Sequence, residues 1–308
     1  MPRERVWSDV PVRPSSPAPE SAPAPAEVTA LRRLAEQVVA GAADHLRTLP
    51  RPWDTGDAGD PGMGEWVGTK SSPTDVVTAS DRAVETRIRE LLADLRPGDA
   101  VFGEEQGRGA GAAVEPGGVV WVVDPIDGTV NFLYGLPWFA VSLAATRDGA
   151  TLAGAVLEPQ SGRLWSAAAG QGATLDGRPL AASRATDVSL SLVGTGFAYD
   201  VVRRTRQAAF TAALLPRVRD VRRSGSAALD LCAVGAGWLD GYVEHGCNWW
   251  DWAAAALVAS EAGAVVRTPG ADGCGHDDGL GRDATLAAAP GIAAGLTDLA
   301  RECGAERV

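Results

Sequence analysis

The stretch WVVDPIDGTVNF, residues 121–132, joins the end of an apolar segment to a concentration of acids. The run VVWVVD that leads into it is continuously apolar, which predicts a strand covered on both faces. Asp124 and Asp127 fall at the C-terminal end of that strand and in the following turn, where open α/β sheets place their ligands. Two carboxylates this close repel each other unless a positive charge lies between them. The stretch therefore predicts a binding site for a positively charged group at the C-terminal end of this strand.

The composition indicates a soluble globular protein and argues against a nucleic-acid-binding function. The 308 residues are 45% hydrophobic and 22% charged, which allows a large core or two subdomains. The 39 acidic residues outnumber the 28 basic ones, and no basic block accompanies the net charge of -11. Because a nucleic acid backbone is bound through basic side chains, nucleic acid is a poor candidate partner.

Neither a membrane anchor nor a disulfide framework is indicated. No apolar run approaches the roughly 18 to 20 residues of a membrane span, and the N-terminal segment lacks the apolar core of a signal peptide. The four cysteines lie far apart without a CxxC pair, which argues against a zinc site or a redox pair. We therefore expect reduced thiols and a cytoplasmic protein.

Three regions of different character follow one another along the chain. Residues 1–26 are dominated by Pro, Ala and Ser, which predicts a disordered tail. Residues 27–185 are expected to form an α+β half, with a β-meander over residues 138–168. Residues 186–308 alternate strand-like and helical segments, as in an α/β unit. The two halves are expected to share one cleft.

Two helices are predicted in the N-terminal half from apolar residues at helical spacing. The first begins near Glu27, and the second begins just after Asp81. Their apolar positions are Leu31, Leu34, Val38 and Leu46 in the first helix, and Val84, Ile88, Leu91, Leu92 and Leu95 in the second.

Two further acidic turns accompany the opening stretch. Glu104 and Glu105 directly follow a short apolar strand, in a turn bounded by glycines. Asp251 lies in the first turn of a predicted helix, where a carboxylate also benefits from the positive end of the helix dipole. Hard divalent cations take oxygen ligands, and magnesium is usually held by a few carboxylates with water and substrate phosphate. The set of acids therefore predicts magnesium better than zinc.

Each of these signals has a simpler explanation when it is taken alone. A D-x-x-D-G sequence is usually a turn, G-E-E is often a solvated loop, and a helix-start Asp is often a cap. What weighs against these explanations is one ordered series of motifs that is hard to obtain by chance. The series is K-S-S-P-T-D, G-E-E, W-V-V-D-P-I-D-G-T-x-N-F and W-D-W-A-A-A.

This ordered series resembles the inositol monophosphatase family of magnesium-dependent, lithium-sensitive phosphatases, within the fructose-1,6-bisphosphatase-like superfamily. The resemblance runs from about residue 30 to the C-terminus. It implies a layered α/β/α/β/α sandwich of the sugar-phosphatase type, a homodimer, two or three Mg²⁺ ions per site and a small phosphorylated metabolite as substrate. The metal ligands that it implies are Glu104, Asp124, the carbonyl oxygen of Ile126, Asp127 and Asp251.

The resemblance also pairs Asp81 with Thr129 as the group that helps to orient the attacking water. A phosphate monoester dianion resists attack by water, so catalysis needs charge neutralisation, a stronger nucleophile and a stabilised leaving group. Magnesium near Glu104 would activate the water, and a second ion near the aspartates would hold the ester oxygen. The N–H groups of Gly128 and Thr129 would donate to the phosphate if they open a short helix.

Substrate choice rests on residues that the resemblance places beside the alcohol part of the substrate, Glu244 and the segment Gly225, Ser226 and Ala227. A carboxylate at Glu244 could accept hydrogen bonds from the hydroxyls of a polyol, or it could pair with an amine. Inositol phosphate, histidinol phosphate and other sugar phosphates therefore stay open. Lys70 is the only lysine of the chain, and it would balance the acids or approach phosphate.

Other classes of protein fit the sequence less well. A haloacid-dehalogenase phosphatase needs two aspartates separated by one residue, whereas Asp124 and Asp127 are separated by two. The chain has no C-x5-R loop, no G-x-S-x-G and no P-loop, and its acids do not follow the spacing of an EF-hand. The alternative from a different class is a non-catalytic regulatory or protein-binding member of the same family.

Overall fold

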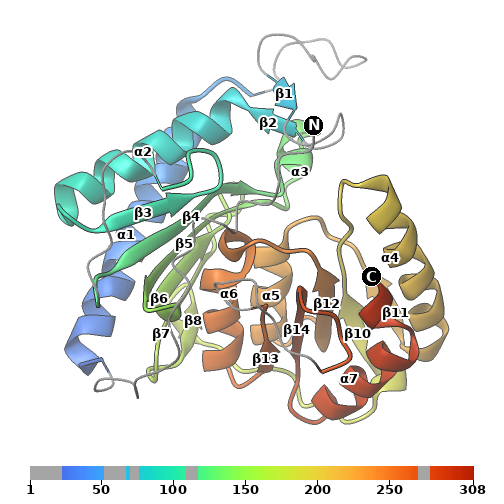
Figure 1. Cartoon of the computed structure of the whole chain (residues 1–308). Helices are drawn as coiled ribbons and strands as arrows, with labels where there is room; N and C mark the ends of the chain where they lie inside the picture. The colour runs from blue at the N-terminus through green and yellow to red at the C-terminus, as the bar shows by residue number, and fades with distance from the viewer. Residues whose placement is uncertain (1–22, 52–66, 70–75, 109–116, 270–277) are drawn as a thin grey trace.

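The computed structural model describes residues 23–51, 67–69, 76–108, 117–269 and 278–308. Two sheets and three pairs of helices stack in five layers, as Figure 1 shows. The outer pair on the first sheet is α1 (Pro25–Thr48) and α2 (Ala79–Leu95), the pair between the sheets is α5 (Ala227–Gly235) and α6 (Trp249–Glu261), and the outer pair on the second sheet is α4 (Val201–Leu214) and α7 (Ala293–Glu302). The layered α/β/α/β/α sandwich expected from the resemblance is confirmed.

The first sheet has seven strands in the order β3-β4-β5-β6-β7-β8-β9. Its strands are β3 (Ala100–Gly103), β4 (Val120–Asp127), β5 (Ala140–Arg147), β6 (Ala150–Leu157), β7 (Leu164–Ala168), β8 (Ala173–Leu175) and β9 (Arg178–Pro179). Only the β3–β4 pair is parallel, and β5 to β7 form the meander predicted for residues 138–168. The pairing of β4 with β5 is irregular between Asp124 and Asp127, so Asp127 ends the strand and does not lie in the turn.

The second sheet has five strands in the order β11-β10-β12-β14-β13. Its strands are β10 (Leu192–Gly194), β11 (Asp220–Arg222), β12 (Gly241–His245), β13 (Val265–Arg267) and β14 (Ala284–Ala288). Strand β10 runs parallel to β11 and to β12, whereas β14 runs antiparallel to its two neighbours. The boundary expected between residues 185 and 186 lies between the last strand of the first sheet and the first strand of the second.

The remaining elements are short. A separate antiparallel pair joins β1 (Val67–Thr69) to β2 (Val76–Thr78), and α3 (Thr129–Leu133) follows β4 directly. Three 3-10 turns cover Val188–Leu190, Leu215–Arg217 and Ala305–Arg307.

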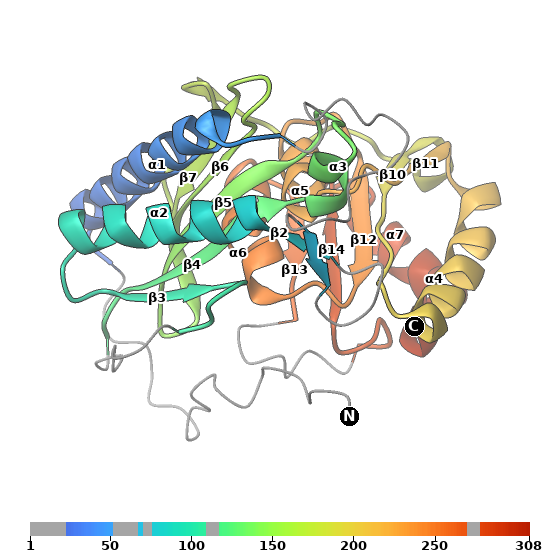
Figure 2. The ribbon, with the colours of Figure 1, turned by 90° about the horizontal axis from the view of Figure 1, so that it is seen from above.

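Small residues let α6 lie close to the first sheet. A Cβ built on Gly154 of β6 would lie 2.8 Å from Cα of Ala254 in α6, so only glycine fits this crossing. On the other face, α1 and α2 run side by side (Figure 2). Leu31 and Val38 of α1 are buried there, as their spacing predicts, and α1 begins two residues before the expected start at Glu27. The first sheet is therefore covered on both faces.

The described residues contain no helix that is long and apolar enough to cross a membrane. Cys232, Cys247 and Cys303 are buried and unbridged, and Cys274 lies outside the described residues. The expectation of reduced thiols is thus confirmed for three of the four cysteines.

Candidate active site

The end of β4 carries the acids of the opening stretch into a buried position. Asp124 is 2% exposed and its Oδ1 accepts a hydrogen bond from the amide of Ile126 at 3.1 Å. Gly128 then takes a left-handed conformation with φ of 94° and begins α3. A Cβ on Gly128 would lie 3.1 Å from the carbonyl oxygen of Gly225 and 3.2 Å from that of Trp138. The glycine is therefore required by the chain's own backbone, and not only by a possible phosphate.

Asp81 and Thr129 meet as the resemblance implied. The Thr129 hydroxyl lies 3.1 Å from Oδ1 of Asp81 and 3.1 Å from the carbonyl oxygen of Ile126. The position of Asp81 differs from the expectation, because it lies inside the first turn of α2 and not before it. Its Oδ2 accepts a hydrogen bond from the amide of Thr78 at 2.8 Å, and Thr78 caps α2 in return. This reciprocal cap fixes the carboxylate that faces Thr129.

The turn that carries Glu104 is anchored by a buried acid that the sequence did not single out. Glu85 of α2 accepts hydrogen bonds from the amides of Glu105 at 2.8 Å and of Gln106 at 3.2 Å. A Cβ on Gly103 would overlap the Glu85 carboxylate, so the glycine lets the turn close over it. Arg89 pairs with Glu85 at 2.8 Å. The signal in the sequence was Gly103 directly before the two acids.

Asp251 enters the same neighbourhood from α6, on the other side of the first sheet. It lies in the first turn, and its Oδ2 accepts a hydrogen bond from the amide of Asn248 at 2.6 Å. Burial raises the pKa of Asp251 well above its usual value, and the charges of Glu104 and Asp127 raise it further. The charges of Glu104, in the turn after β3, and of Asp127, at the end of β4, therefore act on Asp251 of α6.

Asp127 contacts the start of α5. Its Oδ2 accepts hydrogen bonds from the Ser226 hydroxyl and from the amide of Ala228 at 2.8 Å. Burial raises the pKa of Asp127 to about 6, although these hydrogen bonds and the charge of Arg223 oppose the rise. Ser226, predicted as a substrate residue, thus uses its hydroxyl on Asp127 and as the cap of α5.

Asn131 links the two halves of the site. Its side-chain amide donates to the carbonyl oxygen of Trp138 at 2.7 Å and to that of Ser224 at 2.8 Å. Helix α3 consequently lies beside the segment that precedes α5 (Figure 2). Gly225, the next residue, adopts φ of 98° with Asn131 and Arg223 crowding the place of a Cβ.

Glu244 lies near the end of β12, in the second sheet. It is partly exposed and accepts a hydrogen bond from the Tyr242 hydroxyl through Oε2. Burial raises the pKa of Glu244, whereas the Tyr242 hydrogen bond and the charges of Arg223 and Arg203 lower it. The charge of Asp127 also raises that pKa, which places Glu244 within electrostatic reach of Asp127.

A further buried acid, Asp230 of α5, was missed by the sequence reasoning. It is 2% exposed, and its Oδ1 lacks a hydrogen-bond partner among the described residues. Burial, together with the charges of Glu244 and Asp127, raises the pKa of Asp230 to about 7. Its position inside a helix with apolar neighbours gave no sequence signal for a polar role.

The donor set fits a hard divalent cation by its chemistry. Glu104, Asp124, Asp127 and Asp251 offer only oxygen atoms, and positive charge would relieve the burial and repulsion that raise the pKa values of the last two. In the described ranges, however, no group of three or more Asp, Glu, His or Cys side chains is arranged to hold a metal ion. The fit therefore rests on donor chemistry and not on a closed coordination shell. Lys70 lies outside the described residues.

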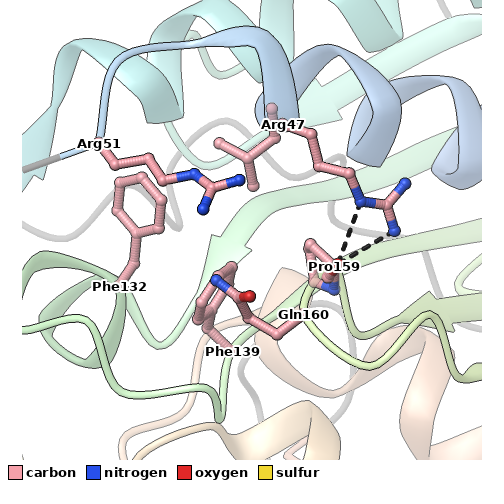
Figure 3. Close-up of a pocket in the computed structure, with 7 residues that line it drawn as sticks. Arg47, Arg51, Phe132, Phe139, Pro159 and Gln160 are labelled. Carbon is pink, nitrogen blue, oxygen red and sulfur yellow. Dashed lines mark hydrogen bonds between the residues drawn. The ribbon is translucent and has the colours of Figure 1, made fainter. Parts of the chain in front are cut away.

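A separate pocket lies at the C-terminal end of α1 and contains none of these acids. It has a volume of about 220 Å³ and is lined by Leu46, Arg47, Arg51, Phe132, Phe139, Pro159 and Gln160. Figure 3 shows the Arg47 guanidinium donating twice to the carbonyl oxygen of Pro159, at 3.2 Å and 3.0 Å. This contact ties α1 to the turn between β6 and β7, which is a structural role.

Comparison with known proteins identifies the family of the chain. The model of the inositol monophosphatase family matches residues 29–305. An inositol-1-monophosphatase of Mycobacterium leprae is 51% identical over 271 residues, which cover 86% of this chain and 91% of that protein. The solved structure of Mycobacterium tuberculosis SuhB has a TM-score of 0.72 and 41% sequence identity, and the match covers 90% of this chain and 98% of that one. The Nus factor SuhB of Pasteurella multocida is 39% identical over 199 residues, which cover 64% of this chain and 73% of that protein.

The chain belongs to the inositol monophosphatase family. It is thereby a phosphoric monoester hydrolase, of a family that is generally metal-dependent and acts on small phosphorylated substrates. The family predicted from the ordered motifs is confirmed.

Proposed function

We propose that this chain hydrolyses inositol monophosphate, or a related polyol phosphate, in a magnesium-dependent reaction with water as the nucleophile. The observation that carries the proposal is the effect of the Glu104 and Asp127 charges on Asp251, whose pKa they raise beyond the effect of burial. Such a group of acids costs stability unless it binds a cation. The names of the mycobacterial relatives support the choice of substrate.

The metal ligands in this proposal are the residues that match the family motif: Glu104, Asp124, the carbonyl oxygen of Ile126, Asp127 and Asp251. Two or three Mg²⁺ ions, when bound, supply the positive charge that neutralises the phosphoryl oxygens and activates the water. The proposed sensitivity to lithium follows from the same resemblance. Asp124 and Asp127 are held at the end of β4, and Asp251 is held in the first turn of α6.

The chain's own residues orient the attacking water. When the Thr129 hydroxyl donates to Asp81, its lone pairs are free to accept a hydrogen bond from the attacking water. Asp81 is held on its other oxygen by Thr78, so the pair is fixed before substrate binds. No covalent phosphoenzyme is part of the proposal, since the acidic set includes no nucleophile beside a base.

Two other readings are kept for test. Histidinol phosphate is an alternative substrate, because Glu244 could pair with its amine. A regulatory, protein-binding role is suggested by the relatives named Nus factor SuhB, but Asp81, Thr129 and the acids are all present in this chain. Their presence supports an enzyme, with or without an added binding role. A homodimer stays a prediction, which light scattering at a monomer mass would refute.

One screen tests the proposed function. The wild type is incubated with inositol 1-phosphate, histidinol phosphate, fructose 1,6-bisphosphate and an adenosine bisphosphate, each with and without magnesium, and released phosphate is measured. We expect inositol 1-phosphate to be hydrolysed with the highest kcat/KM and only when magnesium is present. Preference for histidinol phosphate would select the alternative substrate, and no release from any of them would favour the regulatory reading.

A further inference from the structure

Two neighbouring strands bring matched residues together beside the second half of the site. Strands β10 and β12 are parallel, and Gly194 lies opposite Tyr242 in their register. A Cβ on Gly194 would lie 3.1 Å from Cδ2 of Tyr242, and a Cβ on Gly196 would overlap the carboxylate of Glu244. Two glycines, two residues apart, therefore make room for two side chains that are also two residues apart. Any larger residue at Gly196 would displace Glu244.

Tyr242 holds one oxygen of the Glu244 carboxylate. The Tyr242 ring is 0% exposed, and its hydroxyl donates to Oε2 of Glu244. Burial raises the pKa of the Tyr242 phenol well above its usual value, so the hydroxyl stays protonated and remains a donor. With the phenol on one side and Gly196 on the other, the carboxylate has little freedom to rotate.

Charges of both signs act on Glu244. Arg203 of α4 is fixed by Asp283 at 2.5 Å, and Arg223 follows β11. Burial and the charge of Asp127 raise the pKa of Glu244, whereas the Tyr242 hydrogen bond and the charges of both arginines lower it.

We propose that Tyr242 is a positioning residue that occupies Oε2 of Glu244 and leaves Oε1 to accept a hydroxyl of the leaving alcohol. The pair thereby favours phosphate esters whose alcohol carries a hydroxyl donor over esters without one. This inference rests on the proposed function and adds to it the residues that set the substrate class. Glu244 touches the substrate in this account, whereas Tyr242 and Gly196 act through Glu244.

The test compares two substrates with the same phosphate and different alcohols. Inositol 1-phosphate offers hydroxyl donors, and p-nitrophenyl phosphate offers none. Removing only the phenol oxygen with Tyr242→Phe is expected to lower kcat/KM for inositol 1-phosphate about tenfold, mainly through KM. For p-nitrophenyl phosphate the change is expected to stay within about twofold, because that ester does not use Glu244.

The exposed residue Tyr134 supplies a matched control. Tyr134→Phe makes the same chemical change at a side chain that is 64% exposed, and both kcat/KM values should stay at the wild-type level. Glu244→Gln should repeat the selective loss, and adding Tyr242→Phe to it should cost less than about twofold more, since the two residues act as one unit. Gly196→Ala gives an independent perturbation with the same selectivity. Thermal melting of each variant shows that it is folded.

The outcomes separate the inference from the proposed function. Selective loss with inositol 1-phosphate, non-additive with Glu244→Gln, supports the inference. Equal effects of Tyr242→Phe on both substrates, or no effect on inositol 1-phosphate, overturn the inference while the wild-type activity leaves the proposed function standing. A wild type that prefers histidinol phosphate overturns the selectivity, and a wild type inactive on both phosphates overturns the proposed function together with the inference.

Discussion

The carboxylates on the two sides of the site differ in the charges and hydrogen-bond donors that surround them. On the first-sheet side, Asp251 lies near Glu104 and Asp127, and these like charges add to burial in raising its pKa. On the second-sheet side, Glu244 receives the Tyr242 hydroxyl, and the charges of two arginines oppose the rise in its pKa. After burial, the largest influences on the pKa are therefore like charges at Asp251, but a hydrogen bond and a positive charge at Glu244.

This difference indicates what each side binds. A group of acids that disfavour one another's ionised forms gains most from a cation, which restores all of their charges at once. A carboxylate that is oriented and hydrogen-bonded on one oxygen can accept a further neutral donor on the other. We infer that the first-sheet side binds metal and phosphate and that the second-sheet side recognises the alcohol part of the substrate.

The largest expected effect comes from removing a charge on the first side. Asp124→Asn or Asp251→Asn should lower kcat by about a thousandfold or more, because each removes a charge that the proposed metals require. Phosphate release and magnesium titration measure the two losses. Asp187→Asn, at an exposed turn, is the control and should behave as wild type. Normal turnover in either site variant would remove the basis for the metal-side assignment.

A smaller loss is expected when the water-orienting pair is broken. Thr129→Val keeps the shape of the side chain but removes the hydroxyl that lies 3.1 Å from Asp81. We expect kcat to fall about a hundredfold with KM nearly unchanged, as for the loss of a group that acts only in the reaction step. Steady-state kinetics on inositol 1-phosphate decide this point. A change confined to KM would assign Thr129 to binding instead.

The contrast between the two sides also predicts an effect on stability. In EDTA, Asp251→Asn should raise the melting temperature by about 2 °C or more, because it removes a repulsive charge. Glu244→Gln should give a smaller gain, since the arginines and Tyr242 already offset part of the cost at that position. Differential scanning fluorimetry measures both. An equal or larger rise in melting temperature for Glu244→Gln would contradict the proposed difference between the two sides of the site.

The smallest expected effect is a pH dependence carried by Asp230. Its pKa of about 7 in the fold exceeds the ordinary Asp value of 3.8, so the folded state binds the proton more tightly. The resulting stabilisation is present below about pH 4 and is lost as the pH rises through 7. Melting temperatures in EDTA should therefore show Asp230→Asn gaining on wild type between pH 5 and pH 8. A constant difference across this range would contradict the assigned pKa.

Much of the first side was predictable from local sequence. The apolar run before Asp124 predicted a covered strand, and β4 is that strand. The positions of Glu104 after a short strand and of Asp251 in a first helical turn were also correct, because both depend on neighbours in sequence. Asp81 was expected just before α2. It lies instead in the first turn of that helix, where its side chain takes part in the N-terminal cap.

The second side was less predictable because its contacts depend on strand pairing. The fit between Gly196 and Glu244 exists only once β10 lies beside β12, and nothing local in the sequence fixes that neighbour. Glu85 and Asp230 lie on helices and were also missed. Helical periodicity does not reveal which groups a buried acid contacts in the folded chain. The family resemblance named Glu244 but not the tyrosine that holds it.

The central claim is that the acids of the first side work through bound magnesium. The most direct measurement is phosphate release from inositol 1-phosphate by the wild type after EDTA treatment, followed by titration with Mg²⁺. The account predicts no detectable release in EDTA and full recovery as magnesium is added. Undiminished release in EDTA, with metal removal verified by elemental analysis, would contradict it.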